Sequence, residues 1–373
     1  MKAINRVNLS HIINSVALSS IGVYVAAYLL TLGYPLSKVI LFYVINHAWG
    51  LFFGLFIVVP LIQRWGTINT VKLYFPLQII SLLLLNFLKY KLYPPELVAL
   101  FSGAATYAYW MPINVLFITH SESKDMSQNL SRFFALPQLF GIAGPLIAAL
   151  LIPIIGFWPF FAVAVIGMVL SYLPLAGVDD KEISVRFNFS GAWERLKRQK
   201  LLFLFEGLDN VVEESEWFWG IYVFLLIGSL STPGFVSSLQ QLGGVIFTLF
   251  VGKFVKRNAK KMIPLATMAL MLLYILRLFI TRALPAYIVA SVASFVMTLF
   301  LVSYFSTIFK TIKGDDEVEF VILREIPTVL GRMVVFATIF LVISNLRLFF
   351  IMPLVFAGLL LALYYWKSKQ LAA

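Results

Sequence analysis

Apolar residues fill this sequence in long, unbroken runs separated by short polar segments. Each run has about the 20 residues that a helix needs to cross ~30 Å of hydrocarbon. The runs do not alternate in polarity, as strands of an outer-membrane barrel do. The pattern predicts an all-α polytopic membrane protein with twelve spans, at 11–32, 37–62, 70–89, 97–119, 131–155, 157–177, 201–228, 233–255, 262–281, 284–309, 318–343 and 347–366.

Lys and Arg residues are distributed unequally between the two sides of these spans. With the N-terminus placed inside, 22 lie on the cytoplasmic side, and Arg332 lies within a span. Because cytoplasmic loops are enriched in Lys and Arg, we expect both termini in the cytoplasm. The basic residues occupy short loops and form no single basic face, which argues against nucleic-acid binding. The opposite side holds six: Lys38, Lys89, Lys91, Arg277, Arg282 and Arg347.

Composition narrows the class further. Hydrophobic residues make up 61% of the 373 positions and charged residues 12%, so no separate soluble domain is expected. The absence of cysteine excludes disulfides, zinc–thiolate sites and cysteine nucleophiles. Lys2 and Arg6 precede an apolar segment without a small-residue cleavage site, which predicts an uncleaved first helix. The absence of a transit-like N-terminus, together with the short loops, favours a prokaryotic cytoplasmic membrane.

An internal repeat divides the chain into two halves. Residues 22–25 (GVYV) recur as 220–223 (GIYV), at an offset of 198. Residues 60–64 correspond to 253–257 at an offset of 193, and residues 136–141 to 326–331 at 190. The three matches are collinear and fall on corresponding spans. We therefore expect two pseudo-symmetric six-helix bundles, at 1–178 and 201–373, with a basic cytoplasmic linker at 179–200 that contains an interfacial helix near Trp193.

Twelve spans, internal termini, a basic central loop and a six-plus-six repeat resemble the major facilitator superfamily over essentially the whole chain. Of that family's G-x-x-x-D-R-x-G-R-R loop signature, the first half keeps Arg64 and Gly66. The resemblance implies alternating access around a site at the membrane midplane, lined mainly by spans 1, 4, 7 and 10 and flanked by 2, 5, 8 and 11. The second half keeps Gly252, Arg257, Lys260 and Lys261, and span 5 carries a similar Gly-Pro packing motif at Gly141, Gly144, Pro145, Ala148 and Ala149.

The seventh span carries five of the seventeen acidic residues. At about 100° per residue, four of them fall within one arc and Glu214 points elsewhere. A carboxylate facing lipid is costly, so this stripe is expected to face a hydrated cavity or a cation, or to carry protons. Like charges one turn apart also favour the protonated form of one of them. We therefore assign ion coupling to the stripe, with emphasis on Glu213 and Glu216; its other members are Glu206 and Asp209.

Arg332 is the natural counterion of the stripe, because it lies near the middle of the eleventh span at the depth of Glu213 and Glu216. It could instead bind an anionic group of a substrate, or pair locally with Glu325. Arg324 and Glu325 are expected to form a gate or surface ion pair near the cytoplasmic end.

Other polar and aromatic residues within spans are candidates for a substrate pocket. His47 could titrate near neutral pH or bind a metal, although single buried histidines commonly hydrogen-bond to a neighbouring helix. Aromatic residues in the fourth span could stack on an organic substrate, or simply pack. The candidates are His47, Asn46, Asn14, Tyr24, Tyr107, Tyr109, Trp110, Asn114, Gln138, Gln240, Gln241, Ser303 and Tyr304.

These features predict a secondary transporter for a small solute, coupled to protons or another cation. A divalent-metal site on the stripe is a second version, but one helix cannot surround an ion. The alternative from another class is a membrane-embedded lipid-handling protein or enzyme that uses the stripe and Arg332. Nucleotide loops and hydrolase motifs are missing from the sequence. We expect no enzyme activity, no cofactor, no nucleic acid and no obligate protein partner; the substrate is a small molecule or ion, and the protein a monomer in the bilayer.

Overall fold

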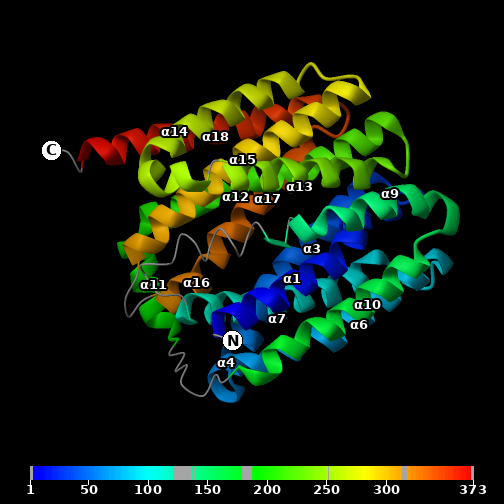
Figure 1. Ribbon diagram of the computed structural model, residues 1–373, viewed down its shortest axis with the longest axis horizontal. Helices are drawn as coiled ribbons and strands as arrows, with labels where there is room; N and C mark the ends of the chain where they lie inside the picture. The colour runs from blue at the N-terminus through cyan, green and yellow to red at the C-terminus, as the bar shows by residue number, and fades with distance from the viewer. Residues whose placement is uncertain are drawn as a thin grey trace.

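The computed structural model describes residues 3–120, 136–137, 139–178, 187–250, 252–312 and 317–370, and these are helical with short connections. Figure 1 shows two bundles side by side, one blue to green and the other green to red. The first contains α1 (Ala3–Gly22), α2 (Val25–Thr31), α3 (Leu36–Phe53), η1 (Gly54–Val58), α4 (Val59–Trp65), α5 (Thr67–Val71), α6 (Tyr74–Phe87), η2 (Leu88–Tyr90), α7 (Pro95–His120), α9 (Ala143–Ile155), α10 (Trp158–Tyr172) and η3 (Leu173–Gly177).

A short amphipathic helix, α11 (Phe189–Arg198), lies between the bundles in the chain. It contains Trp193, as the sequence predicts. Just before it, the carbonyl of Phe187 accepts a hydrogen bond from Gln63 Nε2 at 3.1 Å, and the helix itself contacts α12 and α16. The second bundle contains α12 (Lys200–Ile227), α13 (Thr232–Phe250), α14 (Gly252–Arg277), α15 (Ala283–Ile312), α16 (Glu317–Leu323), α17 (Glu325–Leu341), η4 (Leu346–Phe350) and α18 (Ile351–Gln370).

The two bundles are assembled from equivalent helix pairs, which confirms the pseudo-symmetry expected from the repeat. Packing of α1 on α10, α3 on α7, α6 on α7 and α1 on α9 in the first bundle corresponds to packing of α12 on α18, α13 on α15, α14 on α15 and α12 on α17 in the second. The contacts between bundles follow the same symmetry, because α9 packs on α13 and α17 packs on α3. The fold is therefore an all-α polytopic bundle of two related halves.

Local features repeat as well. The first span of each half ends at a glycine with positive φ, Gly33 (83°) and Gly228 (75°), a conformation that favours glycine because it has no Cβ. In the first half, Tyr74 donates a hydrogen bond to Asn14 Oδ1 on α1 at 2.8 Å. In the second, Tyr274 donates to the carbonyl of Val212 on α12 at 3.1 Å. Both bonds tie the third helix of a half to its first helix.

Two helices begin earlier than the sequence pattern predicts. α1 starts by Ala3 rather than near residue 11, because its first turns pack against the end of the sixth span, where Ser10 Oγ donates to the carbonyl of Ser171 at 2.6 Å. α14 starts at Gly252 rather than 262. Its first turns contain the Lys and Arg residues expected in a loop, and both types are good helix formers.

Six helical stretches among the described residues are long and apolar enough to cross a membrane by length and composition. α12 fails that criterion although it has 28 residues, because it carries five acids and every span-length stretch of it contains at least three of them. Its acids are instead accommodated between helices. The six stretches are Asn5–Thr31, Leu36–Trp65, Thr67–Tyr90, Trp158–Ala176, Ala283–Tyr304 and Leu346–Trp366.

Candidate functional site: a cavity between the two halves

A cavity of about 550 Å³ lies where the first bundle meets α12 and α17. Most of its lining comes from α1, α3, α6 and α7. The second half contributes Glu214 and Trp217 from α12 and Arg332 from α17. Six predicted pocket residues line this cavity: Asn14, Asn46, His47, Tyr109, Trp110 and Arg332.

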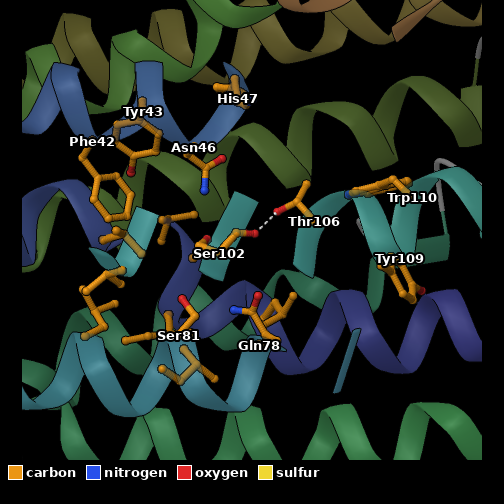
Figure 2. Close-up of a pocket in the computed structure, with 18 of the residues that line it drawn as sticks. Phe42, Tyr43, Asn46, His47, Gln78, Ser81, Ser102, Thr106, Tyr109 and Trp110 are labelled. Atoms are coloured by element: carbon orange, nitrogen blue, oxygen red, sulfur yellow. Dashed lines mark hydrogen bonds between the residues drawn. The ribbon is translucent and has the colours of Figure 1, made fainter. Parts of the chain in front are cut away.

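Uncharged polar side chains occupy the middle of the cavity. Figure 2 shows Asn46 and Ser102 on one side and Gln78 and Ser81 on the other. Within the described residues, the Asn46 side chain makes one long hydrogen bond, from Nδ2 to the carbonyl of Ala99 at 3.5 Å. Four of the polar lining residues were not predicted from the sequence: Gln78, Ser81, Ser102 and Thr106. Isolated serines, threonines and amides within apolar helices give no signal that separates a pocket from ordinary packing.

Aromatic rings lie at both ends of this polar region. In Figure 2, Trp110 lies at one end and Phe42 and Tyr43 at the other. The Tyr43 ring packs edge-on against Trp217 of the second half, with centroids 4.3 Å apart. Phe336 of α17 contacts both rings, at 6.2 and 5.9 Å. Tyr43, Trp217 and Phe336, the aromatic cluster, pack together across the boundary between the halves, and Tyr43 and Trp217 also line the cavity.

Next to the aromatic cluster, a charged group joins three helices. Arg332 Nε on α17 lies 3.1 Å from Glu214 Oε2 on α12, and its Nη1 lies 3.3 Å from His47 Nδ1 on α3. Because arginine can only donate, His47 Nδ1 must accept this hydrogen bond, which places the imidazole proton on Nε2. The Arg332 group, defined as these three residues, therefore links the two halves.

Arg332 pairs with a different acid of α12 from the ones expected. It contacts Glu214, which was predicted to point away from the stripe, rather than Glu213 or Glu216. The reason is the close approach of α17 to α12: a Cβ at Gly331 would collide with the carbonyl oxygen of Gly207. This contact fixes the face of α12 that Arg332 meets.

Glu216 pairs with Arg277 at the end of α14. Nη1 and Nη2 donate to the two carboxylate oxygens at 2.7 and 2.6 Å, and the Arg277 side chain is fully buried. Its guanidinium also lies over the rings of Trp219, Tyr274 and Phe350, 4.6 to 5.9 Å from their centroids. The inward packing of Arg277, which the sequence places at the external end of its span, was not predicted from the sequence.

Glu206 and Asp209, the other two stripe residues, are fully buried. Arg324 Nε lies 3.7 Å from Glu206 Oε2, and Tyr304 donates to Oε1 of the same carboxylate at 3.5 Å. Arg324 therefore pairs across helices with α12. Among the described residues, neither carboxylate oxygen of Asp209 has a hydrogen-bond partner. Glu213 is partly buried, and no ion pair involves it within the same residues.

The remaining candidates lie outside the central cavity. Tyr24 is buried beside Gly234 of α13, and Tyr107 packs against Gly50 and Gly54 of the second span. Gln240 lines a separate cavity of about 210 Å³ with Glu216, Trp217, Ser237, Gln241, Ser294 and Met297. Tyr304 contacts Glu206, Asn114 is partly buried in α7, and Gln138 lies outside the described residues. Within those residues, no three His, Asp or Glu side chains converge as a metal site.

Solved structures with the same arrangement identify the fold. A bacterial homologue of the iron transporter ferroportin, in an outward-facing state, matches with a TM-score of 0.73 and 12% identity over 99% of this chain and 100% of its own. The chain has the major facilitator fold. A major facilitator superfamily transporter in its outward conformation has a TM-score of 0.71 at 12% identity, covering 98% of each chain. A variant of the same transporter, the E. coli fucose:proton symporter, gives 0.68 at 13%, over 98% of each chain.

A nucleoside transporter, solved as a point mutant, also has this fold, with a TM-score of 0.66 and 14% identity over 98% of this chain and 99% of its own. No protein-family model matches the sequence, and no curated protein matches it. The assignment of the major facilitator fold therefore rests on structural similarity and not on sequence similarity.

Proposed function

We propose that this chain is a secondary transporter that moves a small polar solute across a prokaryotic cytoplasmic membrane by alternating access. The cavity carries the proposal, because both halves line it and it lies at their boundary. When repeated halves rock against each other, a site there can open to either side in turn. The major facilitator fold supports this proposal. The protein is proposed to act as a monomer, with both termini cytoplasmic and halves at residues 1–178 and 201–373.

The acids of α12 supply the coupling site in this proposal. Glu216 is held by Arg277 through two hydrogen bonds, which a proton would have to displace. Among the described residues no cation is hydrogen-bonded to Asp209 or Glu213. The charge of Arg324 acts on Asp209 and that of Arg332 on Glu213 from farther away, and the two acids lie within electrostatic range of each other. Burying an ionised carboxylate without a partner costs several kcal/mol, and a bound proton removes that cost. We therefore infer that Asp209 and Glu213 carry the coupling proton.

Reconstituted protein tests the function directly. Proteoliposomes with an imposed pH gradient are expected to accumulate at least one solute from a panel of sugars, nucleosides, amino acids and metal ions. A protonophore should abolish that accumulation. Failure to move any solute in the panel across the membrane would contradict the transporter assignment. Movement that ignores the gradient would retain transport and remove proton coupling.

Two acid variants then test the coupling site. In Asp209→Asn and Glu213→Gln, a neutral side chain replaces the acid, so gradient-driven accumulation should vanish while exchange of labelled for unlabelled solute survives. Glu194→Gln is the matched control, because Glu194 is an exposed acid on α11, and it should behave as the wild type. If both variants accumulate solute with unchanged pH dependence, these acids are not the coupling site.

A further inference from the structure

We infer that the cavity binds an uncharged, ring-shaped solute rich in hydroxyl or amide groups, such as a sugar or a nucleoside, rather than an ion. This inference rests on the proposed transport function and specifies its substrate class. Three properties of the lining carry it: its charge, its hydrogen-bonding groups and its rings.

The charge of the lining is balanced within the protein. Among the described lining residues, Glu214 and Arg332 are the ones with a formal charge, and they face each other at 3.1 Å. The neighbouring imidazole of His47 accepts a hydrogen bond from the same guanidinium. A charged solute would have to displace one partner and leave the other unpaired, which is costly in a buried site. The lining therefore favours a neutral molecule.

The polar groups of the lining can both donate and accept. Side-chain amides and hydroxyls do so, which matches the hydroxyl and amide groups of a solute. In the part of the chain that the structure describes, no side-chain hydrogen bond is found for Gln78, Ser81 or the Ser102 hydroxyl, although Ser81 is only 3% exposed. Gln78 and Ser102 are partly buried, and all three side chains line the cavity, so a solute bound there can complete their hydrogen bonds.

The rings limit the shape of the solute. Trp110 and Tyr43 bracket the polar groups from opposite ends (Figure 2), and the Tyr43 ring packs on Trp217, which also lines the cavity. Aromatic faces pack well against the apolar faces of sugar rings or against planar bases. A volume of about 550 Å³ is within the range of roughly 300–1,000 Å³ found for small-molecule pockets. A ring with polar edges fits this arrangement better than a compact ion does.

The lining also separates two tasks between the halves. The first half supplies Asn46, Gln78, Ser81 and Ser102 to the lining, and the second half supplies the charged pair. The proposed proton-binding acids of α12, Asp209 and Glu213, lie outside this lining. Recognition of a neutral solute in one half and proton binding in the other can then be altered independently.

Binding to purified protein in detergent tests the inference without any transport. Neutral sugars and nucleosides are compared with charged analogues (sugar acids, amino sugars and nucleotides), amino acids and divalent metal ions, using thermal unfolding and calorimetry. At least one neutral compound should raise the unfolding temperature and bind, and its charged analogues should bind more weakly. The sugar and nucleoside arms distinguish the two neutral classes.

Variants locate that binding in the cavity. Ser81→Ala and Ser102→Ala should each weaken it by about threefold to tenfold, the effect of one lost neutral hydrogen bond. Ser171→Ala, a buried serine of α10 whose hydroxyl bonds within its own helix, should leave it unchanged. The ligand-free unfolding temperature of each variant checks that it is folded.

Three outcomes would overturn the inference. They are binding by charged compounds alone, no binding by any neutral compound, and unchanged affinity in both serine variants. If a neutral solute binds but never crosses proteoliposome membranes, the inference holds and the transport function fails. If only a charged solute crosses, transport holds and the inference fails.

Discussion

Arg332 both lines the cavity and joins the two halves of the protein. It is 23% exposed toward the cavity and contacts Glu214 of its own half and His47 of the other. An arginine buried in a membrane protein must keep an anionic partner, because its charge is permanent. The Arg332 group is therefore expected to behave as one energetic unit.

A double-mutant cycle measures the coupling energy between Arg332 and Glu214. Arg332→Ala and Glu214→Gln should each lower thermal stability and transport, and the double variant should be less damaged than the sum by about 0.5–3 kcal/mol, the range for residues in contact. Arg332→Ala combined with Glu216→Gln is the control and should be additive, because Glu216 pairs with Arg277. If the losses from Arg332→Ala and Glu214→Gln simply add in the double variant, the two residues are not energetically coupled.

The buried pair of Glu216 and Arg277 is expected to serve stability. Arg277→Met alone leaves a carboxylate without its partner, which should cost about 3–5 kcal/mol and lower the unfolding temperature in detergent. The double variant with Glu216→Leu should recover much of that loss, because two apolar side chains need no partner.

The exposed pair of Lys38 and Glu96 is the matched control for that experiment. Its atoms are 2.8 Å apart, but the Lys38 side chain is 48% exposed. Breaking it with Lys38→Gln should cost about 1 kcal/mol or less. Equal losses for Lys38→Gln and Arg277→Met would contradict the structural role of the buried pair.

At the scale of helices, the packing of α17 on α12 decides which side chains meet. Gly331 allows this approach, since a Cβ there would collide with the Gly207 carbonyl. Successive residues of a helix differ by about 100° in direction, so a small rotation of α17 would bring Arg332 to a different acid. The glycine contact thus controls the charge pairing.

Gly331→Val should separate these two helices. We expect a loss of about 1–3 kcal/mol from overpacking, together with reduced transport because the Arg332 group is displaced. Gly220→Ala in α12 is the control: the nearest heavy atom to a Cβ there is Val236 Cγ1 at 4.0 Å, so the change should be tolerated. A stable, active Gly331→Val protein would show that the contact does not position Arg332.

At the scale of the whole molecule, α11 and the connection between α12 and α13, here called the tip, lie at opposite ends (Figure 1). The natural chain has no cysteine, so single cysteines can report topology. Ser229→Cys, exposed at that tip, should react with an impermeant thiol reagent in intact cells. Glu194→Cys on α11 should be protected until the membrane is opened. Labelling of Glu194→Cys from outside would reverse the proposed orientation.

The sequence by itself determined the helical spans, their order and the division into related halves. Apolar run length and collinear repeats are local properties of the chain, so they can be read without knowing which helices touch. It also located the acids of α12 and Arg332 within spans, because intramembrane charges stand out against apolar neighbours.

Only the tertiary structure decided which of these groups meet. The partner of Arg332, the enclosure of Arg277 by aromatic rings and the line of uncharged polar groups in the cavity depend on how each helix is rotated about its axis. That rotation is set by close contacts between helices far apart in sequence, such as Gly331 against Gly207 and Tyr43 against Trp217. In apolar helices the hydrophobic pattern is nearly uniform around the axis, so the sequence carries little information about which face turns inward.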